Sequence, residues 1–322
     1  MMSTRTHLWS TDFLPELRLG LENLRAHKLR SLLTMMGMIF GVAAVVAMLS
    51  IGAGAQQEVM AFIEQLGVRN LIVEAREAPD NQTLQKVRKL SSGLSFQDLR
   101  VIESNLDGIS AASARKRFTP SKLSPKPLGG DVPMVYGVSP AYKVIGNLQV
   151  ASGRFFDDAE TTAAAPVAVL GEAAASTLFG ADDPIGRYVK VNDQWFLVIG
   201  VAGPQLTVQT DVAGLPAQDR NNIIYVPLYS SVFRLEDGQS AQKDEIDGIY
   251  LQMKQGADVP SAAAMIRGIL DVAHRGAGDF SIISPAELLA EQRRTQRIFE
   301  MVMVAIASIS LLVGGIGIMN IM

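Results

Sequence analysis

The chain has 322 residues, enough for about two domains, and its net charge of −3 gives no basic surface for nucleic acid. It contains no cysteine, which excludes disulfides, thiolate nucleophiles and cysteine-based metal sites. Hydrophobic residues make up 48% and the mean hydropathy is +0.21, so we expect apolar sequence to be concentrated in particular segments.

Residues 1–31 predict a cytoplasmic amphipathic helix. Phe13, Leu17, Leu21 and Leu24 share one stripe, with basic residues between them. Such a helix is expected to lie along the inner surface of a membrane. The alternative is a simple cytoplasmic extension of the segment that follows.

Two uncharged runs, residues 32–55 and 301–322, predict transmembrane helices. At about 1.5 Å rise per residue, the first run reaches about 36 Å, enough to cross a hydrocarbon core of about 30 Å. A signal peptide is the first alternative, because Ala53-Gly54-Ala55 resembles a cleavage site, but the run is long and about 31 residues precede it. A buried soluble helix is the second alternative.

The flanking charges predict the orientation of these spans. Arg25, Lys28 and Arg30 lie just before the first run, and basic residues favour the cytoplasmic side. Arg293, Arg294 and Arg297 precede the second run, but they end a long loop, and long loops translocate largely regardless of charge. We therefore expect a cytoplasmic N-terminus and an extracytoplasmic domain over residues 56–300. The chain ends inside the second span, so we expect that span to be truncated.

Small residues in both runs indicate faces where helices could pack. Gly37 and Gly41 form a GxxxG pair, and Ser310 and Gly314 form a small-xxx-small pair. Small side chains let helix backbones approach closely. The alternative is that they reflect the ordinary frequency of glycine in membrane helices.

Two helices are expected to leave the membrane as a stalk. Val59, Ile63 and Leu66 continue a helical stripe beyond the first run, and Gly67 is a typical helix C-cap. The sequence Ser-Pro-Ala-Glu at 284–287 predicts the start of a helix that continues into the second run. Continuous helices would act as levers, whereas the alternative is that the stripe only packs against the domain.

The outer domain is predicted to be α+β and split. Residues 56–125 and 240–300 form a porter-like part, with strands at 70–76 and 109–118, helices from Ser95 and over 261–274, and a polar, loop-like stretch at 77–94. A cluster of proline and glycine residues at 120–130 marks a boundary. Residues 126–239 read as an inserted β-rich subdomain with a hairpin around Asn192-Asp193.

Recognisable chemistry is absent from the sequence. It lacks a GxxxxGK(S/T) phosphate loop and an HExxH zinc motif. We interpret Asp157-Asp158 and Asp182-Asp183 as turn or cap residues, and we expect His274 to be solvated at a helix end. We therefore predict no catalytic, cofactor-binding or metal-binding residue, and no enzyme activity in this chain.

Several stretches together resemble the MacB/FtsX-type family of ABC transporter permeases, in particular the MacB-like periplasmic core. They are spread in order over nearly the whole chain: ENLRAHKLRSLLTMMGMIFGVAAVVAMLSIGAGA, GVSPAYKVIGNLQVASGRFF, VAVLGEAAASTLFGADDPIGRYVKV, NNIIYVPL and SLLVGGIGIMNIM. The resemblance implies two further spans and a separate or fused ABC ATPase, neither of which this sequence contains.

The resemblance also implies function and partners. It implies a homodimer or a pair of related permeases in a bacterial inner membrane, in contact with the lipid bilayer. A periplasmic adaptor and an outer-membrane channel are further expected partners. ATP-driven closure would be transmitted along the stalk for export of substrate. One alternative is an FtsX-like mechanotransmitter that activates a cell-wall hydrolase, and another is a two-span membrane sensor.

Overall fold

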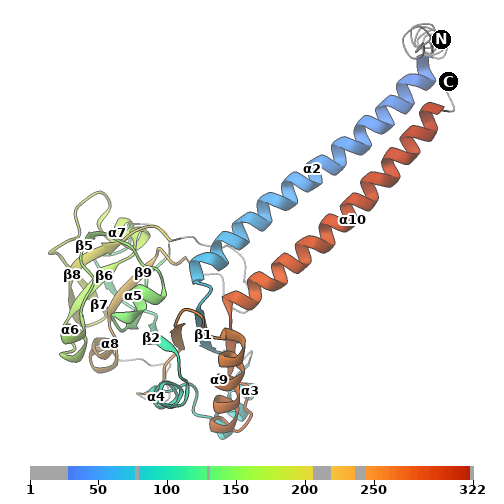
Figure 1. The fold of residues 1–322 in the computed structure, drawn as a ribbon. Coiled ribbons are helices and arrows are strands. Elements are labelled where there is room, and N and C mark those ends of the chain that lie inside the picture. Colours follow the sequence, from blue (N-terminus) through green and yellow to red (C-terminus); the bar gives the residue numbers. More distant parts are fainter. Residues whose placement is uncertain (1–27, 77–79, 129–130, 206–218, 236–243, 320–322) are drawn as a thin grey trace, which may run out of the picture. The chain divides into compact units, whose positions relative to one another are not determined.

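The computed structural model describes residues 28–76, 80–128, 131–205, 219–235 and 244–319 (Figure 1). The chain divides into two compact units. One contains the chain up to Glu58 and from Gln292 onwards, and the other runs from Val59 to Glu291.

Two long helices enter and leave the second unit. Helix α2 spans Lys28–Leu66 and helix α10 spans Pro285–Met319. Among the described residues, no helix combines the length and the apolarity that crossing a membrane requires, so the two predicted spans are not confirmed. The predicted amphipathic helix over residues 1–31 lies almost entirely outside the described residues.

The unit from Val59 to Glu291 is built on one mixed sheet with the strand order β11-β1-β10-β2-β4-β9-β6-β8-β7-β3, with β5 paired to β8. The strands of the porter-like part pair antiparallel throughout. Parallel pairs, β4 with β9 and β6 with β8, occur in the other half. The predicted α+β class is correct at this level. The strands are β1 (Asn70–Ala75), β2 (Ile109–Phe118), β3 (Leu123–Ser124), β4 (Met134–Val138), β5 (Val150–Gly153), β6 (Val167–Leu170), β7 (Tyr188–Val191), β8 (Gln194–Ala202), β9 (Ile223–Pro227), β10 (Gly248–Met253) and β11 (Phe280–Ile283).

Alternation along the strands sends side chains to opposite faces of this sheet. In β1, Leu71 and Val73 enter a core cluster with the helices α4 and α9, while Ile72 enters a different cluster with α5. A third cluster packs α7 against the strands of the inserted part. The helices of this unit are α3 (Asn81–Leu90), α4 (Phe96–Asn105), α5 (Ala141–Ile145), α6 (Asp158–Thr162), α7 (Glu172–Phe179), α8 (Leu228–Arg234) and α9 (Val259–Ala273).

Local sequence signals located many of these elements. Ser95 and Asp98 form a capping box at the start of α4, and Asp157 caps α6 together with Glu160. The predicted hairpin is β7–β8, and Asn192 occupies its turn with a positive φ of 51°. The strands around 70–76 and 109–118 are also confirmed.

One local prediction was wrong and another was incomplete. Residues 81–90 were read as loop but form α3, which Asp80 caps by accepting a hydrogen bond from the Thr83 backbone. Its apolar residues Leu84, Val87 and Leu90 recur at helical spacing, but three apolar residues in a polar stretch form a stripe too short to be recognised. The inserted part, which is predicted to be β-rich, contributes the strands β4 to β9. It also contains α5, α6, α7 and α8, which the prediction does not include because helices of five to eight residues are too short for periodicity to reveal.

Candidate functional site: anchored helix ends and two buried charge clusters

The last turn of α2 is anchored in the core of the second unit. Ile63 is fully buried, and Leu66 belongs to the cluster that also contains Ile72 and Ile145. Gly67 follows with a φ of +84°, a conformation that glycine adopts without strain, and ends the helix as predicted. Nothing is described of the Val59 side chain. The predicted stalk stripe therefore enters the domain core at two of its three positions.

The first turn of α10 is anchored in the same cluster. Ser284 caps this helix by accepting a hydrogen bond from the Glu287 backbone at 3.4 Å. Leu288 packs against the cluster that contains Leu66, and Leu289 is buried. Both long helices thus end against one set of apolar side chains.

The first buried charge cluster lies within the sheet. Arg115 on β2 forms an ion pair with Glu74 on β1 at 2.5 Å, and both are buried. Arg115 also donates to the Tyr250 hydroxyl at 2.5 Å, and that hydroxyl donates to Glu74 at 2.6 Å. The guanidinium lies 4.8 Å from the ring centre of Tyr136 on β4. Strands from both halves of the sheet therefore contribute to this cluster.

Arg115 remains charged in this environment. Burial acts to lower its pKa, but the Glu74 carboxylate and the surrounding tyrosines outweigh burial and place the pKa well above its ordinary value. Burial raises the pKa of Tyr250 well above its ordinary value.

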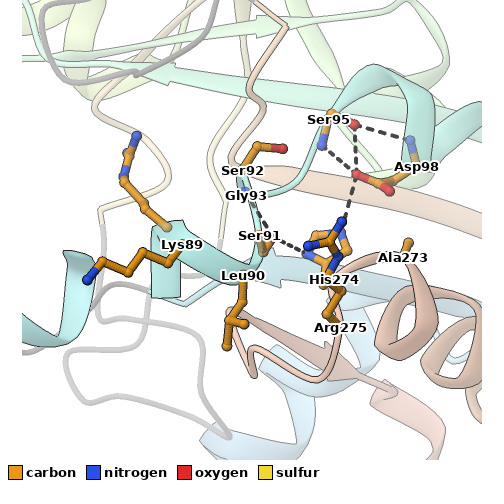
Figure 2. Close-up of a pocket in the computed structure, with 11 residues that line it drawn as sticks. Lys89, Leu90, Ser91, Ser92, Gly93, Ser95, Asp98, Ala273, His274 and Arg275 are labelled. Carbon is orange, nitrogen blue, oxygen red and sulfur yellow. Dashed lines mark hydrogen bonds and ion pairs between the residues drawn. The ribbon is translucent and has the colours of Figure 1, made fainter. Parts of the chain in front are cut away.

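The second buried cluster surrounds His274 at the end of α9 (Figure 2). The imidazole Nδ1 lies 2.9 Å from Asp279 and 2.8 Å from the Ser91 hydroxyl, while Nε2 lies 3.4 Å from Asp98. Ser91 donates to Asp279 at 2.6 Å. His274 is only 3% exposed, so the prediction of a solvated histidine was wrong. Its neighbours were missed because Ser91, Asp98 and Asp279 come from separate parts of the chain.

The two carboxylates hold His274 in its charged form. Burial acts to lower its pKa, but hydrogen bonds to Asp279 and Asp98 raise it to about 9. Burial acts in the opposite sense on Asp98, where hydrogen bonds from His274 and Ser95 hold the pKa below its ordinary value. The pKa of Asp279 is lowered in the same way by His274 and Ser91.

This arrangement contains serine, histidine and aspartate but does not form a nucleophilic triad. In such a triad the serine and the aspartate lie on opposite ring nitrogens, so the imidazole can accept the serine proton. Here Ser91 and Asp279 lie on the same nitrogen, and Asp98 lies on the other. A charged imidazole between two carboxylates has no free nitrogen that could accept a proton. The cluster therefore links α3, α4, α9 and β11 to one another.

A shallow pocket of about 290 Å³ opens beside this cluster and is lined by Arg88, Lys89, His274 and Arg275 (Figure 2). Arg88 and Lys89 lie in the last turn of α3, and His274 caps the end of α9. The C-terminal end of a helix bears partial negative charge, which favours cations there. The helix ends therefore account for the basic lining, without a bound anion.

The predicted helix-packing residues lie in the two long helices. Gly37 and Gly41 fall within α2, and Ser310 and Gly314 within α10. A Cβ at Gly41 would meet nothing within 4 Å. The surroundings of the other three lie outside what the structure describes, so their role stays a prediction.

The structure adds residues that the sequence reading passed over, although signals existed. Glu74 is the one charged residue of the mostly apolar strand β1, and such a residue is buried only when it is paired. Arg115 is the first of three consecutive basic residues in β2, so the sequence does not single it out as the partner. Asp98 belongs to the capping box of α4, and its second role as a partner of His274 depends on tertiary folding.

Comparison with known proteins identifies the family to which this fold belongs. The family profile of the MacB-like periplasmic core domain matches residues 31–269. The periplasmic region of MacB from Actinobacillus actinomycetemcomitans shares the fold, with a TM-score of 0.53 at 18% identity over 74% of this chain and 95% of that one. The chain therefore belongs to the MacB-like periplasmic core domain family.

Longer relatives carry the same segment. The chain is 31% identical to the macrolide export ATP-binding/permease protein MacB of Bdellovibrio bacteriovorus, over 99% of this chain and 48% of that protein. It is 30% identical to the pyoverdine export ATP-binding/permease protein PvdT of Pseudomonas syringae pv. tomato, over 98% of this chain and 45% of that protein. The chain therefore spans about half the length of the curated relatives it matches.

Proposed function

We propose that this chain is the permease part of an ABC exporter, which transmits ATP-driven movement across a membrane to its extracytoplasmic domain. The single observation behind this proposal is that α2 and α10 both end in one core cluster, through Leu66 and Leu288. A displacement of either helix along its axis would reach the packed interior, because close-packed interiors transmit strain. ATP hydrolysis is assigned to a separate ATPase subunit or domain, as the names of the longer relatives suggest.

The proposal includes two membrane spans, at residues 32–55 and 301–322. Both runs are uncharged in the sequence. Many large apolar side chains of α2 and α10 are exposed, and a contiguous exposed apolar surface marks contact with lipid or protein. They include Leu32, Met35, Ile39, Phe40, Val46, Ile306, Ile309 and Leu312.

The proposed location is a bacterial inner membrane, with a cytoplasmic N-terminus and residues 56–300 outside. The proposed partners are an ABC ATPase, a second permease copy, a periplasmic adaptor and an outer-membrane channel. Since the native chain has no cysteine, a single Val272→Cys substitution at an 81% exposed position of α9 reports the topology. We expect it to react with a membrane-impermeant maleimide before the inner membrane is opened. Reaction only after opening would contradict the orientation.

The lever is tested by breaking α10 outside the domain core. Arg294 is exposed and lies in the helix interior beyond Glu291, where the second unit ends. Proline there removes a helical hydrogen bond and clashes with the preceding turn, at about 3 kcal/mol or more. In the full-length protein with its ATPase, we expect Arg294→Pro to retain ATP hydrolysis but to lose export.

The matched control is Arg294→Ala, which removes the same charge and keeps the helix. It is expected to retain export. Protease resistance of the outer domain should be the same in both variants, because Arg294 contributes nothing to that core. Full export by Arg294→Pro with an intact domain would refute the lever.

A further inference from the structure

Asn70, the first residue of β1, connects the ends of two helices. It is 2% exposed, and its side-chain amide Nδ2 donates to the Leu66 carbonyl at 2.5 Å and to the Ile145 carbonyl at 2.6 Å. Leu66 is the last residue of α2 and Ile145 is the last residue of α5. The final carbonyls of a helix have no partner within the helix, so one amide group caps two helices at once.

The orientation of the Asn70 amide follows from these partners. Both are carbonyl oxygens, which only accept, so the nitrogen must face them. The remaining atom, Oδ1, is buried and has no hydrogen-bond partner. Leaving a buried acceptor unsatisfied is unfavourable, and an apolar residue would avoid it. The double contact therefore exists despite a local cost in stability.

The helix α5 lies within the inserted part of the domain but packs toward the porter-like strands. Its residues Tyr142 and Ile145 share the core cluster with Leu66 of α2. The turn before α5 is tied to β2 by a hydrogen bond from the Ser139 backbone to the Ser113 hydroxyl at 3.2 Å. In addition to the apolar packing, the hydrogen bonds of Asn70 connect the end of α2 to the inserted part, and hydrogen bonds have a defined direction.

We propose that Asn70 is a positioning residue that couples movement of α2 to movement of α5 and, through α5, to the inserted part. This inference rests on the proposed function, since it specifies how the transmitted movement divides within the domain. Apolar contacts allow sliding, whereas an amide group that donates one N–H to each helix end fixes the two ends relative to one another in distance and direction. Without the amide, α2 would still pack against the core, but a movement of α2 would no longer move α5.

The test measures nucleotide-dependent movement inside the domain. Spin labels are placed at Val144→Cys in α5 and Leu90→Cys at the end of α3, which are 60% and 50% exposed, and residues 1–322 contain no native cysteine. In the full-length permease with its ATPase, we expect the label-to-label distance to shift when ATP replaces the nucleotide-free state. Asn70→Ala should abolish this shift while the nucleotide-free distance and ATP hydrolysis remain.

A matched variant separates coupling from general destabilisation. Asn221 also makes two hydrogen bonds with backbone atoms, both to Gln205, but contacts neither α2 nor α5 through them. Asn221→Ala should lower the melting temperature comparably and keep the full shift. Asn70→Thr retains one donor and a strand-forming side chain, so it should fold even where Asn70→Ala does not, and it should show a reduced shift.

The outcomes distinguish this inference from the proposed function. A full shift in folded Asn70→Ala or Asn70→Thr would overturn the coupling role and leave the lever intact. A wild-type protein that shows no shift would overturn both. Loss of the shift in Asn221→Ala as well would show that any weakening of the domain suffices, and would also overturn the specific role of Asn70.

Discussion

Both buried clusters compensate the charge of a buried cation, but they use different groups. Around Arg115, a cation that stays protonated is paired with Glu74 and Tyr250 inside the sheet. Around His274, a titratable cation is held between Asp98 and Asp279 where helix ends meet. Both clusters compensate buried charge with hydrogen bonds, which is the condition for burying charge at all. The clusters differ in the pKa of their cation, which lies well above the ordinary value for Arg115 and at about 9 for His274.

The two clusters join different parts of the domain. The Arg115 cluster joins β1, β2, β4 and β10 and so spans both halves of the sheet. The His274 cluster joins α3, α4, α9 and the start of β11 at the periphery of the porter-like part. We therefore expect disruption of the first to destabilise the domain as a whole, and disruption of the second to act locally and to depend on pH.

The largest expected effect comes from removing one partner of the Arg115 cluster. Glu74→Gln leaves the buried guanidinium uncompensated, which typically costs about 3–5 kcal/mol. Chemical denaturation should show this loss at neutral pH. The double variant Glu74→Leu/Arg115→Met removes both charges and is expected to recover most of the stability. A double variant as unstable as the single one would mean that packing, and not charge, dominates this site.

The next effect is the pH dependence of the His274 cluster. The pKa of His274 is raised from 6.5 to about 9 on folding, so its stabilisation is complete below pH 6.5 and is lost as the pH rises through 9. Because the cluster borders an open pocket, we expect about 1–3 kcal/mol rather than the full value of the shift. Stability measured from pH 6 to pH 10 should fall accordingly.

The variant His274→Gln tests the origin of that slope. It should reduce the stability at pH 6 and flatten the alkaline dependence between pH 6 and pH 10. On the acid side the sign reverses: the lowered pKa values of Asp98 and Asp279 provide stability that is lost as the pH falls through their folded values, below 3.8. An unchanged alkaline slope in His274→Gln would show that other groups cause it.

The sequence predicted what depends on neighbours along the chain and missed what depends on tertiary contacts. Features defined within a few residues can be predicted from the sequence. They include the capping box of Ser95 and Asp98, the turn at Asn192 and the C-cap Gly67. The burial of His274 could not be predicted, because its partner Ser91 lies 183 residues away in the sequence.

The long helices show the same division. Their continuity and caps could be predicted from local sequence, and the structure confirms the ends at Leu66 and Pro285. Their common anchorage could not be predicted, because Leu66 and Leu288 meet only through a cluster assembled by the sheet. The same holds for the amide of Asn70, whose second partner lies 75 residues away.

The smallest expected effect concerns Ser95, which has both a local role at the start of α4 and a role in the His274 cluster. Ser95 caps α4 by accepting from the Asp98 backbone, and its hydroxyl also donates to the Asp98 carboxylate at 2.8 Å. Ser95→Ala removes both bonds, and loss of a helix cap typically costs about 1 kcal/mol. Since the hydroxyl helps to hold the pKa of Asp98 down, we also expect the acid transition to move to higher pH. Ser95→Thr keeps a hydroxyl and should restore both properties. A loss of stability without any shift of the acid transition would mean that Ser95 acts on the helix alone, and that the His274 cluster is independent of its cap.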